Sequence, residues 1–201
     1  RNVSFEAIAA AKQIADGGEV VGALIGDQVA SLTDELIAYG ADRAIIVEHP
    51  NLKVYTSDGF SQALLAIVDQ VKPDGIVIGH TSLGKDLAPK VASRLQTGLV
   101  SDVTEIEGSG DDTIFTRPIY SGKAFEKVKI KEGLIFVTVR PNNIAPLEKD
   151  TNRSGEVAAL TVDIQNLRTI VKEVIRNAST GVDLSEAKGI VQRDVVRVIT
   201  P

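Results

Sequence analysis

Apolar residues follow two alternating patterns along the first hundred positions of the chain. Short runs rich in β-branched residues, typical of buried strands, alternate with longer segments in which apolar residues recur at helical spacing. The runs predict strands at 19–25, 44–47 and 75–79, and the longer segments predict helices that start near Ser4, Ser31, Ser57 and Lys85. Strands that alternate with helices build a parallel sheet covered by helices on both faces.

The pattern changes after Leu99. Four strand-like segments follow with only a few turn-forming residues between them, at 100–106, 113–120, 125–130 and 134–139. Links this short allow antiparallel hairpins but not the crossover that joins parallel strands. We therefore predict a three-layer, Rossmann-like α/β fold with a mainly parallel sheet and an antiparallel extension formed by residues 100–139.

The last part of the chain is less regular. We predict a polar loop at 141–155, a strand at 158–162, a helix capped by Asn166, a linker at 177–181 and an isolated strand at 189–199. Because the chain opens on a helix, its first strand–helix unit is incomplete, and a strand before Arg1 would complete it. Alternatively, residues 195–199 fill this open sheet edge or pair with a neighbouring chain.

Composition narrows the class of protein. With 43% hydrophobic and 24% charged residues the chain can bury a core, and its net charge of −5 argues against binding to nucleic acid or anionic membranes. No apolar run approaches the length that spans a bilayer, and no leader marks the chain for secretion, so we expect a cytoplasmic protein. The lack of Cys excludes disulfides and thiolate metal sites, and the lack of Met, even at position 1, indicates a fragment.

Residues Gly79–Asp86 have the spacing G-x-x-x-x-G-K of a phosphate-binding P-loop, after a predicted strand and before a predicted helix. The position after the lysine, which is Ser or Thr in a P-loop, is Asp86, whose carboxylate would repel a phosphate. The favoured interpretation is therefore a tight turn in which glycine gives backbone freedom. Such a turn still lies at the carboxyl end of a parallel strand, where open α/β sheets bind ligands or partners.

Further polar residues follow the predicted strands. His80 is a candidate general base, but no partners for a catalytic triad are apparent, so a structural or exposed role is the favoured interpretation. Arg117, Tyr120 and Lys123, with Arg140 after the next strand, either contact an anion or a partner or tie the strands together by hydrogen bonds. No catalytic constellation and no metal-binding cluster stands out in the sequence.

Five blocks of sequence, in a fixed order, form a more specific signal than any single motif. They are 1–7 (RNVSFEA), 79–90 (GHTSLGKDLAPK), 98–103 (GLVSDV), 116–125 (TRPIYSGKAF) and 139–143 (VRPNN). Together they resemble the alpha subunit of electron transfer flavoprotein, most closely its bacterial members, over residues 1–188. Residues 189–201 resemble the far C-terminal stretch of the same family, and the core of the flavin domain that normally lies between these parts is absent.

The resemblance implies an electron carrier and not an enzyme. Members of the family pair with a beta subunit and carry FAD. They accept electrons from flavin dehydrogenases, such as those that act on acyl-CoA in fatty acid β-oxidation, and pass them to a quinone reductase of the respiratory chain or to another acceptor. It implies that residues 1–188 are the α/β scaffold domain that docks the beta subunit. Because most FAD contacts belong to the absent domain, we expect this chain alone to hold FAD weakly or not at all.

For a scaffold, the residues of interest are those that contact a partner or another domain. The strand-end loops supply the candidates, namely His80, Thr81, Ser82, Lys85, Arg117, Tyr120, Lys123 and Arg140. An alternative function is a stand-alone nucleotide-binding or sensor module of the same architecture, and Asp86 argues against it. A hydrolase or transferase would need a catalytic group that the sequence lacks.

Overall fold

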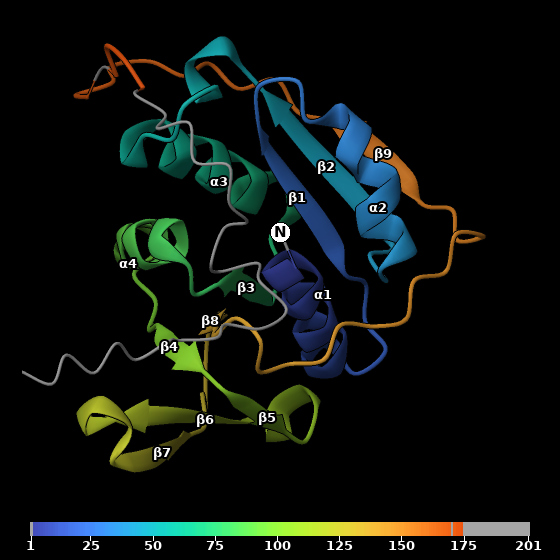
Figure 1. Ribbon diagram of the computed structural model, residues 1–201, viewed down its shortest axis with the longest axis vertical. Helices are drawn as coiled ribbons and strands as arrows, with labels where there is room; N and C mark the ends of the chain where they lie inside the picture. The colour runs from blue at the N-terminus through green and yellow to red at the C-terminus, as the bar shows by residue number, and fades with distance from the viewer. Residues whose placement is uncertain (1, 170, 175–201) are drawn as a thin grey trace, which may run out of the picture.

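The computed structural model describes residues 2–169 and 171–174 and has a three-layer α/β arrangement (Figure 1). Helices and strands alternate first: α1 (Asn2–Ala15), β1 (Val21–Gly26), α2 (Thr33–Ala38), β2 (Arg43–Glu48), α3 (Ser57–Val71), β3 (Gly75–Gly79) and α4 (Ser82–Leu95). Strands then follow one another: β4 (Val100–Val103), β5 (Glu105–Glu107), β6 (Ile114–Ile119), β7 (Ala124–Val128), β8 (Ile135–Val139) and β9 (Glu156–Ala159). The predicted fold class is confirmed.

Two of the helices begin after a threonine that caps them. The Oγ1 of Thr56, one residue before the cap predicted at Ser57, accepts a hydrogen bond from the backbone N–H three residues later in α3. Thr81 does the same for α4, which therefore starts before Lys85. Because α4 starts at Ser82, Pro89 lies in the interior of the helix.

Six strands form two parallel sheets of three strands each, in the orders β1-β2-β9 and β3-β8-β4. The central place of β8 corrects the prediction that residues 134–139 belong to the antiparallel extension. Val137 of β8 pairs in parallel with Val77 of β3 on one side and with Val100 of β4 on the other. The prediction was wrong because the whole excursion over residues 104–134, and not the short link before β8, is the crossover between β4 and β8.

The excursion contains the antiparallel sheet β5-β6-β7. β6 and β7 pair as neighbouring antiparallel strands from Phe115↔Val128 to Ile119↔Ala124, which confirms that part of the prediction. The strand predicted at 100–106 is divided in two, because Asp102 adopts a left-handed φ of 68° at an irregularity in the pairing with β8. β4 therefore continues the parallel sheet, whereas β5 turns away to pair with β6.

The strand predicted at 158–162 is β9, which begins two residues earlier and pairs with β2. Beyond it, residues 160–169 and 171–174 contain no helix, which contradicts the helix predicted from Asn166. Asn166 has a φ of 54°, whereas an N-cap residue needs extended backbone. Leu167 instead packs beside Ile164 on the core under α3. The predicted linker at 177–181 and strand at 189–199 lie outside the described residues.

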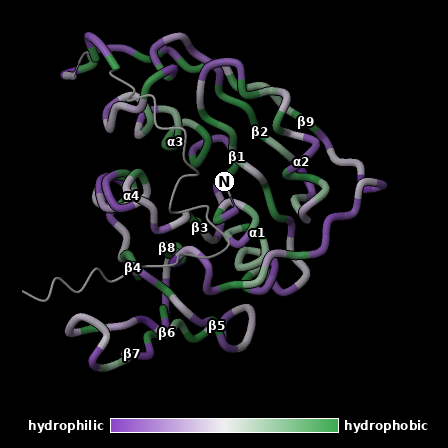
Figure 2. Tube along the Cα trace, in the orientation of Figure 1, coloured by the Kyte–Doolittle hydropathy of each residue, from purple (hydrophilic) through white to green (hydrophobic). Residues whose placement is uncertain are grey.

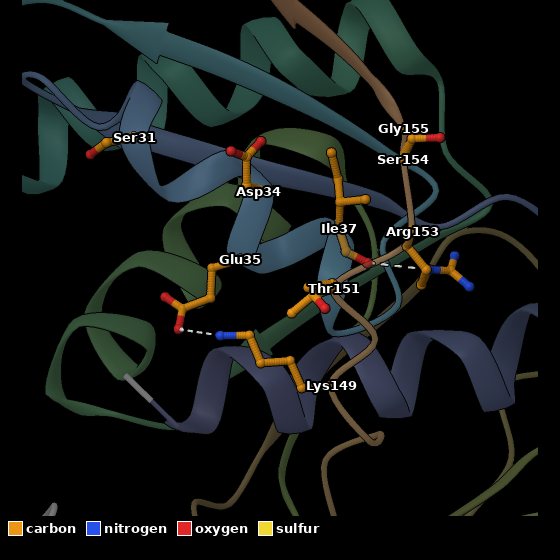
Figure 3. Close-up of a pocket in the computed structure, with 10 residues that line it drawn as sticks. Ser31, Asp34, Glu35, Ile37, Lys149, Thr151, Arg153, Ser154 and Gly155 are labelled. Atoms are coloured by element: carbon orange, nitrogen blue, oxygen red, sulfur yellow. Dashed lines mark hydrogen bonds and ion pairs between the residues drawn. The ribbon is translucent and has the colours of Figure 1, made fainter.

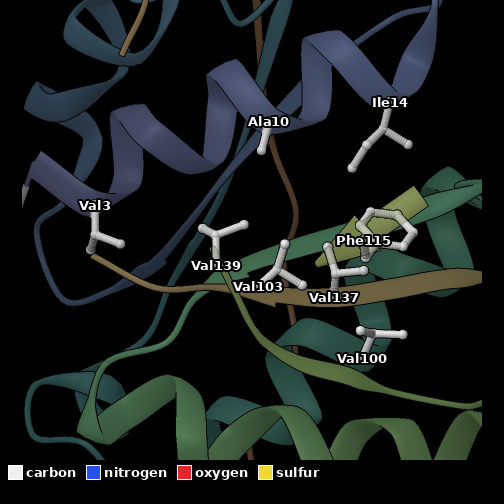
Figure 4. Close-up of a cluster of buried hydrophobic side chains, with 8 residues drawn as sticks. All are labelled: Val3, Ala10, Ile14, Val100, Val103, Phe115, Val137 and Val139. Carbon is white, nitrogen blue, oxygen red and sulfur yellow. The ribbon is translucent and has the colours of Figure 1, made fainter. Parts of the chain in front are cut away.

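Buried side chains lie on both faces of the sheets. On one face, α1 packs over β8 and β4 in a cluster made of Val3, Ala10, Ile14, Val100, Val103, Phe115, Val137 and Val139 (Figure 4). On the other face, α3 and α4 cover Ile45, Ile76 and Phe136. Figure 2 shows hydrophobic residues along the strands and hydrophilic ones along the outer loops. Within the described part of the chain, no helix is long and apolar enough to cross a bilayer.

Candidate functional site

The carboxyl ends of β3, β8 and β4 bring three of the chain's polar residues together. His80 follows β3, Arg140 follows β8, and Asp102 lies in β4. Asp102 accepts two hydrogen bonds from the guanidinium of Arg140, from Nε to Oδ1 at 2.9 Å and from Nη2 to Oδ2 at 2.6 Å. Such a fork-like pair fixes the orientation of both side chains. The three parallel strands therefore end in a preorganised ion pair.

Thr138 connects this ion pair to His80. Its Oγ1 accepts a hydrogen bond from the backbone N–H of Asp102 at 3.0 Å and lies 2.8 Å from Nδ1 of His80. Thr138 is 1% exposed, and in the tautomer in which its hydroxyl donates to Nδ1 the ring proton of His80 is on Nε2. Nε2 faces the carboxylate oxygen Oδ1 of Asp102 at 3.5 Å, which favours this tautomer. His80 is thus a positioned, neutral member of the network.

The electrostatics of the site agree with this assignment. The hydrogen bonds from Arg140 hold the pKa of Asp102 below its usual value of 3.8, although partial burial acts in the opposite direction. Burial lowers the pKa of His80 below its usual value of 6.5, and the charges of Lys85, Arg140 and Arg117 lower it further, against the opposing effect of Asp102. The cluster therefore keeps a carboxylate and a neutral imidazole among three cations.

The predicted site residues divide into three groups. His80 and Arg140 belong to the network, and Lys85 and Arg117 lie near enough to it to affect the pKa of His80. Thr81 and Ser82 start α4, as its cap and its first residue. Tyr120 and Lys123 lie on the β6–β7 turn and are exposed, Tyr120 to 78%. Sequence reasoning missed Asp102, although a charged residue inside a strand-like run was a signal that could have identified it.

Comparison with known proteins shows to which family this chain belongs. Residues 1–165 match the electron transfer flavoprotein domain family. The chain belongs to that family. It is 53% identical over 191 residues to the electron transfer flavoprotein subunit alpha of Bacillus subtilis, with 95% of this chain and 59% of that protein covered. The family match confirms the resemblance found in the sequence.

Two further relatives are similar to this chain. The electron transfer flavoprotein subunit alpha of Thermoanaerobacterium thermosaccharolyticum is 35% identical over 94% of the chain and 59% of that protein. The acryloyl-CoA reductase electron transfer subunit beta of Anaerotignum propionicum is 43% identical over 53% of the chain and 29% of that protein. The chain thus spans about three fifths of the length of the alpha subunits that it matches.

The P-loop-like segment of the chain is a tight turn. Only His80 and Thr81 separate β3 from α4, which leaves no loop to wrap a phosphate. A Cβ on Gly84 would lie 2.0 Å from the carbonyl oxygen of Gly79, so this glycine permits close packing of helix on strand. Asp86 accepts a hydrogen bond of 2.6 Å from the hydroxyl of Tyr55. Among the described residues, no group of three or more acidic or histidine side chains could hold a metal ion.

A surface hollow of about 490 Å³ lies between α2 and the loop before β9 (Figure 3). Three of the charged side chains that line it, those of Glu35, Lys149 and Arg153, contact one another or neighbouring groups of the chain. Nζ of Lys149 lies 4.0 Å from Oε1 of Glu35, and Arg153 donates to the carbonyl oxygen of Ile37 and pairs with Asp42. The hollow therefore offers charges of both signs that mostly have partners already, and the strand-end cluster remains the candidate site.

The lowered pKa of His80 predicts a specific dependence of stability on pH. The unfolded chain binds a proton at His80 more readily than the folded chain, so the free energy of unfolding should fall as pH drops from about 6.5 to the folded pKa. One proton gives at most about 1.4 kcal/mol per pH unit, and partial solvent contact of His80 reduces this. The variant His80→Gln should flatten the decrease in urea titrations between about pH 7.5 and 5, whereas His49→Gln should keep it. An unchanged pH profile in His80→Gln would contradict the assignment.

Proposed function

We propose that residues 1–188 are the N-terminal scaffold domain of an electron transfer flavoprotein alpha subunit, which docks a beta subunit and supports a flavin domain. The observation that carries this proposal is the 53% identity to the alpha subunit of Bacillus subtilis across 95% of this chain. The covered 59% of that protein leaves room there for a further domain. In the proposal, FAD belongs to that further part, and residues 189–201 correspond to the end of the family's chain.

The complete protein, in this proposal, accepts electrons from flavin dehydrogenases of the acyl-CoA type and passes them to the respiratory chain in the bacterial cytoplasm. A relative named as an electron transfer subunit of acryloyl-CoA reductase supports a link to CoA substrates. The chemistry of electron transfer belongs to the flavin, and the protein supplies its position and surroundings. This division of roles accounts for a site that holds an ion pair and a neutral histidine but no acid–base pair.

A nucleotide-binding or sensor module is the second candidate function. It would require a loop that wraps phosphate oxygens and a hydroxyl for Mg²⁺. The direct passage from β3 into α4 and the carboxylate of Asp86 both oppose this function. We therefore propose that the candidate site docks a partner and does not bind a nucleotide.

The charges around the cluster support docking of an acidic partner surface. Lys85, Arg117 and Lys123 take part in no ion pair within the described residues, although the chain as a whole carries a net charge of −5. Nε of Arg117 is buried and has no hydrogen-bond partner. Beside these cations, the β6–β7 hairpin exposes Tyr120 to 78% and Phe125 to 65%. Aromatic and cationic side chains together are typical of residues that dominate protein interfaces.

Charge reversal tests this docking surface. The double variant Lys85→Glu, Arg117→Glu should weaken the complex with the matching beta subunit at least tenfold, or about 1.4 kcal/mol, because two favourable charge contacts become repulsive. Titration by isothermal calorimetry or biolayer interferometry at low and moderate salt measures the effect.

The matched control is Lys72→Glu, Lys131→Glu, which reverses two exposed charges at the opposite, amino-terminal ends of β3 and β8. This control should leave the affinity within about twofold, or about 0.4 kcal/mol. If the first double variant also stays within that range, the strand-end loops are internal structure and the docking surface lies elsewhere. If the unmodified chain forms no complex with the beta subunit, the scaffold proposal itself is overturned.

A further inference from the structure

Two cations at the carboxyl end of the sheet β3-β8-β4 have no counter-charge among the described residues. Arg140 is balanced there by Asp102, and His80 is neutral near pH 7. Lys85 and Arg117 take part in none of the ion pairs of the described residues. The charges of Lys85 and Arg117 therefore remain unbalanced beside an ion pair that is already complete.

The side chain of Arg117 lies on the face of β6 that packs on the parallel sheet. Alternate residues of a strand share a face, so Arg117 is on the same face as Phe115. Phe115 is 0% exposed and packs in one cluster with Val103 of β4 and Val139 of β8 (Figure 4). Val139 is the residue before Arg140. Arg117 therefore approaches the ends of β4 and β8 from the antiparallel sheet.

Lys85 approaches the same place from α4. Its backbone N–H donates to the carbonyl oxygen of Thr81 at 2.8 Å, so Lys85 lies on the first turn of the helix, close to His80. Close packing of Gly84 on the end of β3 fixes this turn. The charges of Lys85 and Arg117 both lower the pKa of His80, which agrees with their approach from two sides.

Neither of the nearest carboxylates of the chain neutralises these two cations. Asp86 follows Lys85, but it accepts a hydrogen bond of 2.6 Å from the hydroxyl of Tyr55, before α3. Glu126 of β7 lies opposite Arg117 in the strand register. It is exposed and belongs to none of the ion pairs of the described residues.

The surroundings of Arg117 make its charge costly to leave without a partner. Its Nε is buried and has no hydrogen-bond partner, and the residue as a whole is half-buried. A partly desolvated charge loses hydration that only an opposite charge or hydrogen bonds replace. An anion at the guanidinium of Arg117 would therefore be bound favourably.

We propose that Lys85 and Arg117, beside the ion pair of Asp102 and Arg140, bind one oxyanion, either a carboxylate or a phosphate. A guanidinium holds two oxygens of such a group side by side, and an ammonium adds a point charge. Asp102 is not this carboxylate, because both of its oxygens already accept hydrogen bonds from Arg140. The oxyanion is a carboxylate side chain of the docked beta subunit or a free phosphate ion. The first of these sources rests on the proposed docking function, whereas the site itself does not.

Titration of the full chain with inorganic phosphate tests the site. Sodium chloride keeps the ionic strength constant, and NMR signals of the imidazole rings report binding. Phosphate should shift the signals of His80 saturably and leave those of His49 unchanged. It should also raise the pKa of His80 toward the usual value of 6.5, because an anion opposes the cations that lower it.

Three variants locate the bound phosphate. Arg117→Gln and Lys85→Gln should each weaken phosphate binding about fivefold, whereas Lys72→Gln, at the opposite end of β3, should not change it. Lys85 is exposed, so its replacement keeps the chain folded even if Arg117→Gln does not. The site is overturned if the shift does not saturate or if both variants bind phosphate like the unmodified chain. It is also overturned if phosphate binds only to Glu126→Gln, since Glu126 is then the anion that Arg117 holds.

Competition with the matching beta subunit separates the two sources of the oxyanion. If a carboxylate of the beta subunit fills the site, phosphate should weaken the complex at constant ionic strength, and Arg117→Gln should remove this competition. If phosphate binds without competing, the ligand is free phosphate and the carboxylate source is wrong. If phosphate binds but no complex with the beta subunit forms, the docking function is overturned and the oxyanion site stands.

Discussion

Replacing Gly84 by alanine should lower the free energy of unfolding by about 2–4 kcal/mol, at or above the upper end of overpacking effects. The added Cβ would lie 2.0 Å from the carbonyl oxygen of Gly79 and 3.3 Å from the side chain of Ile78. The first obstacle is backbone, so no side-chain rotation relieves it. The start of α4 must move away from β3, and the buried contacts of Leu87 and Ala88 loosen with it.

Gly98→Ala is the matched control for this prediction. No atom lies within 4 Å of the position that its Cβ would occupy, and its backbone conformation is accessible to alanine. Its free energy of unfolding should stay within about 0.5 kcal/mol of the unmodified chain, as for most surface substitutions. Urea denaturation followed by circular dichroism gives both values. Equal stability of the two variants would mean that α4 and β3 are not in the close contact described here.

The close contact at Gly84 illustrates what the sequence could reveal. The G-x-x-x-x-G-K spacing placed a turn between a strand and a helix, and the mismatch at Asp86 favoured a structural turn over a phosphate site. The spacing could not distinguish a glycine that frees the backbone from one that lets two elements approach. That difference depends on the distance between β3 and α4, which is a property of the packed structure.

Strands were predicted well where their patterns are local. Apolar runs such as those of β1, β2 and β3, and the hairpin of β6 and β7, are visible in the sequence because turn residues and apolar periodicity lie within a few positions of each other. The place of β8 in the parallel sheet is not visible in the sequence, because its partners β3 and β4 lie far from it along the chain. The antiparallel strands between β4 and β8 also make the connection look like a series of hairpins. At Asn166, a periodic apolar pattern was outweighed by a left-handed residue and by packing of Leu167 on the core.

The candidate site was also predicted only in part, because some of its contacts join segments that lie far apart in the sequence. His80 and Arg140 were selected because each follows an apolar strand, but their proximity was not predicted, because it depends on the parallel place of β8 between β3 and β4. A charged residue inside a strand-like run marked Asp102 in the sequence, but its partners could not be predicted, because they depend on a bulge and a left-handed backbone in β4. Yet Asp102 is the residue that joins Arg140, Thr138 and His80 into one network.

Replacement of Asp102 should have the second large effect on the free energy of unfolding. Asp102→Ala should lower the free energy of unfolding by about 1.5–3 kcal/mol at pH 7, the range for hydrogen bonds to charged groups. The value should lie toward the lower end because the side chain of Arg140 is 43% exposed and is partly solvated once it is unpaired. Asp102→Asn should cost less, because asparagine tolerates a φ of 68° and its amide oxygen still accepts one hydrogen bond from Arg140.

The dependence on pH separates the contribution of the ion pair from that of the backbone. The pKa of Asp102 is lower in the folded chain than its usual value of 3.8, so the stabilisation by the carboxylate is present above that value and disappears as pH falls through the folded pKa. The difference in unfolding free energy between the unmodified chain and Asp102→Asn should therefore shrink as pH is lowered from 7 to about 3. The additional loss in Asp102→Ala should persist over the same range, because it reflects the left-handed backbone and the orphaned neighbours. If both variants unfold with the same free energy as the unmodified chain at pH 7, Asp102 does not hold the strand ends together.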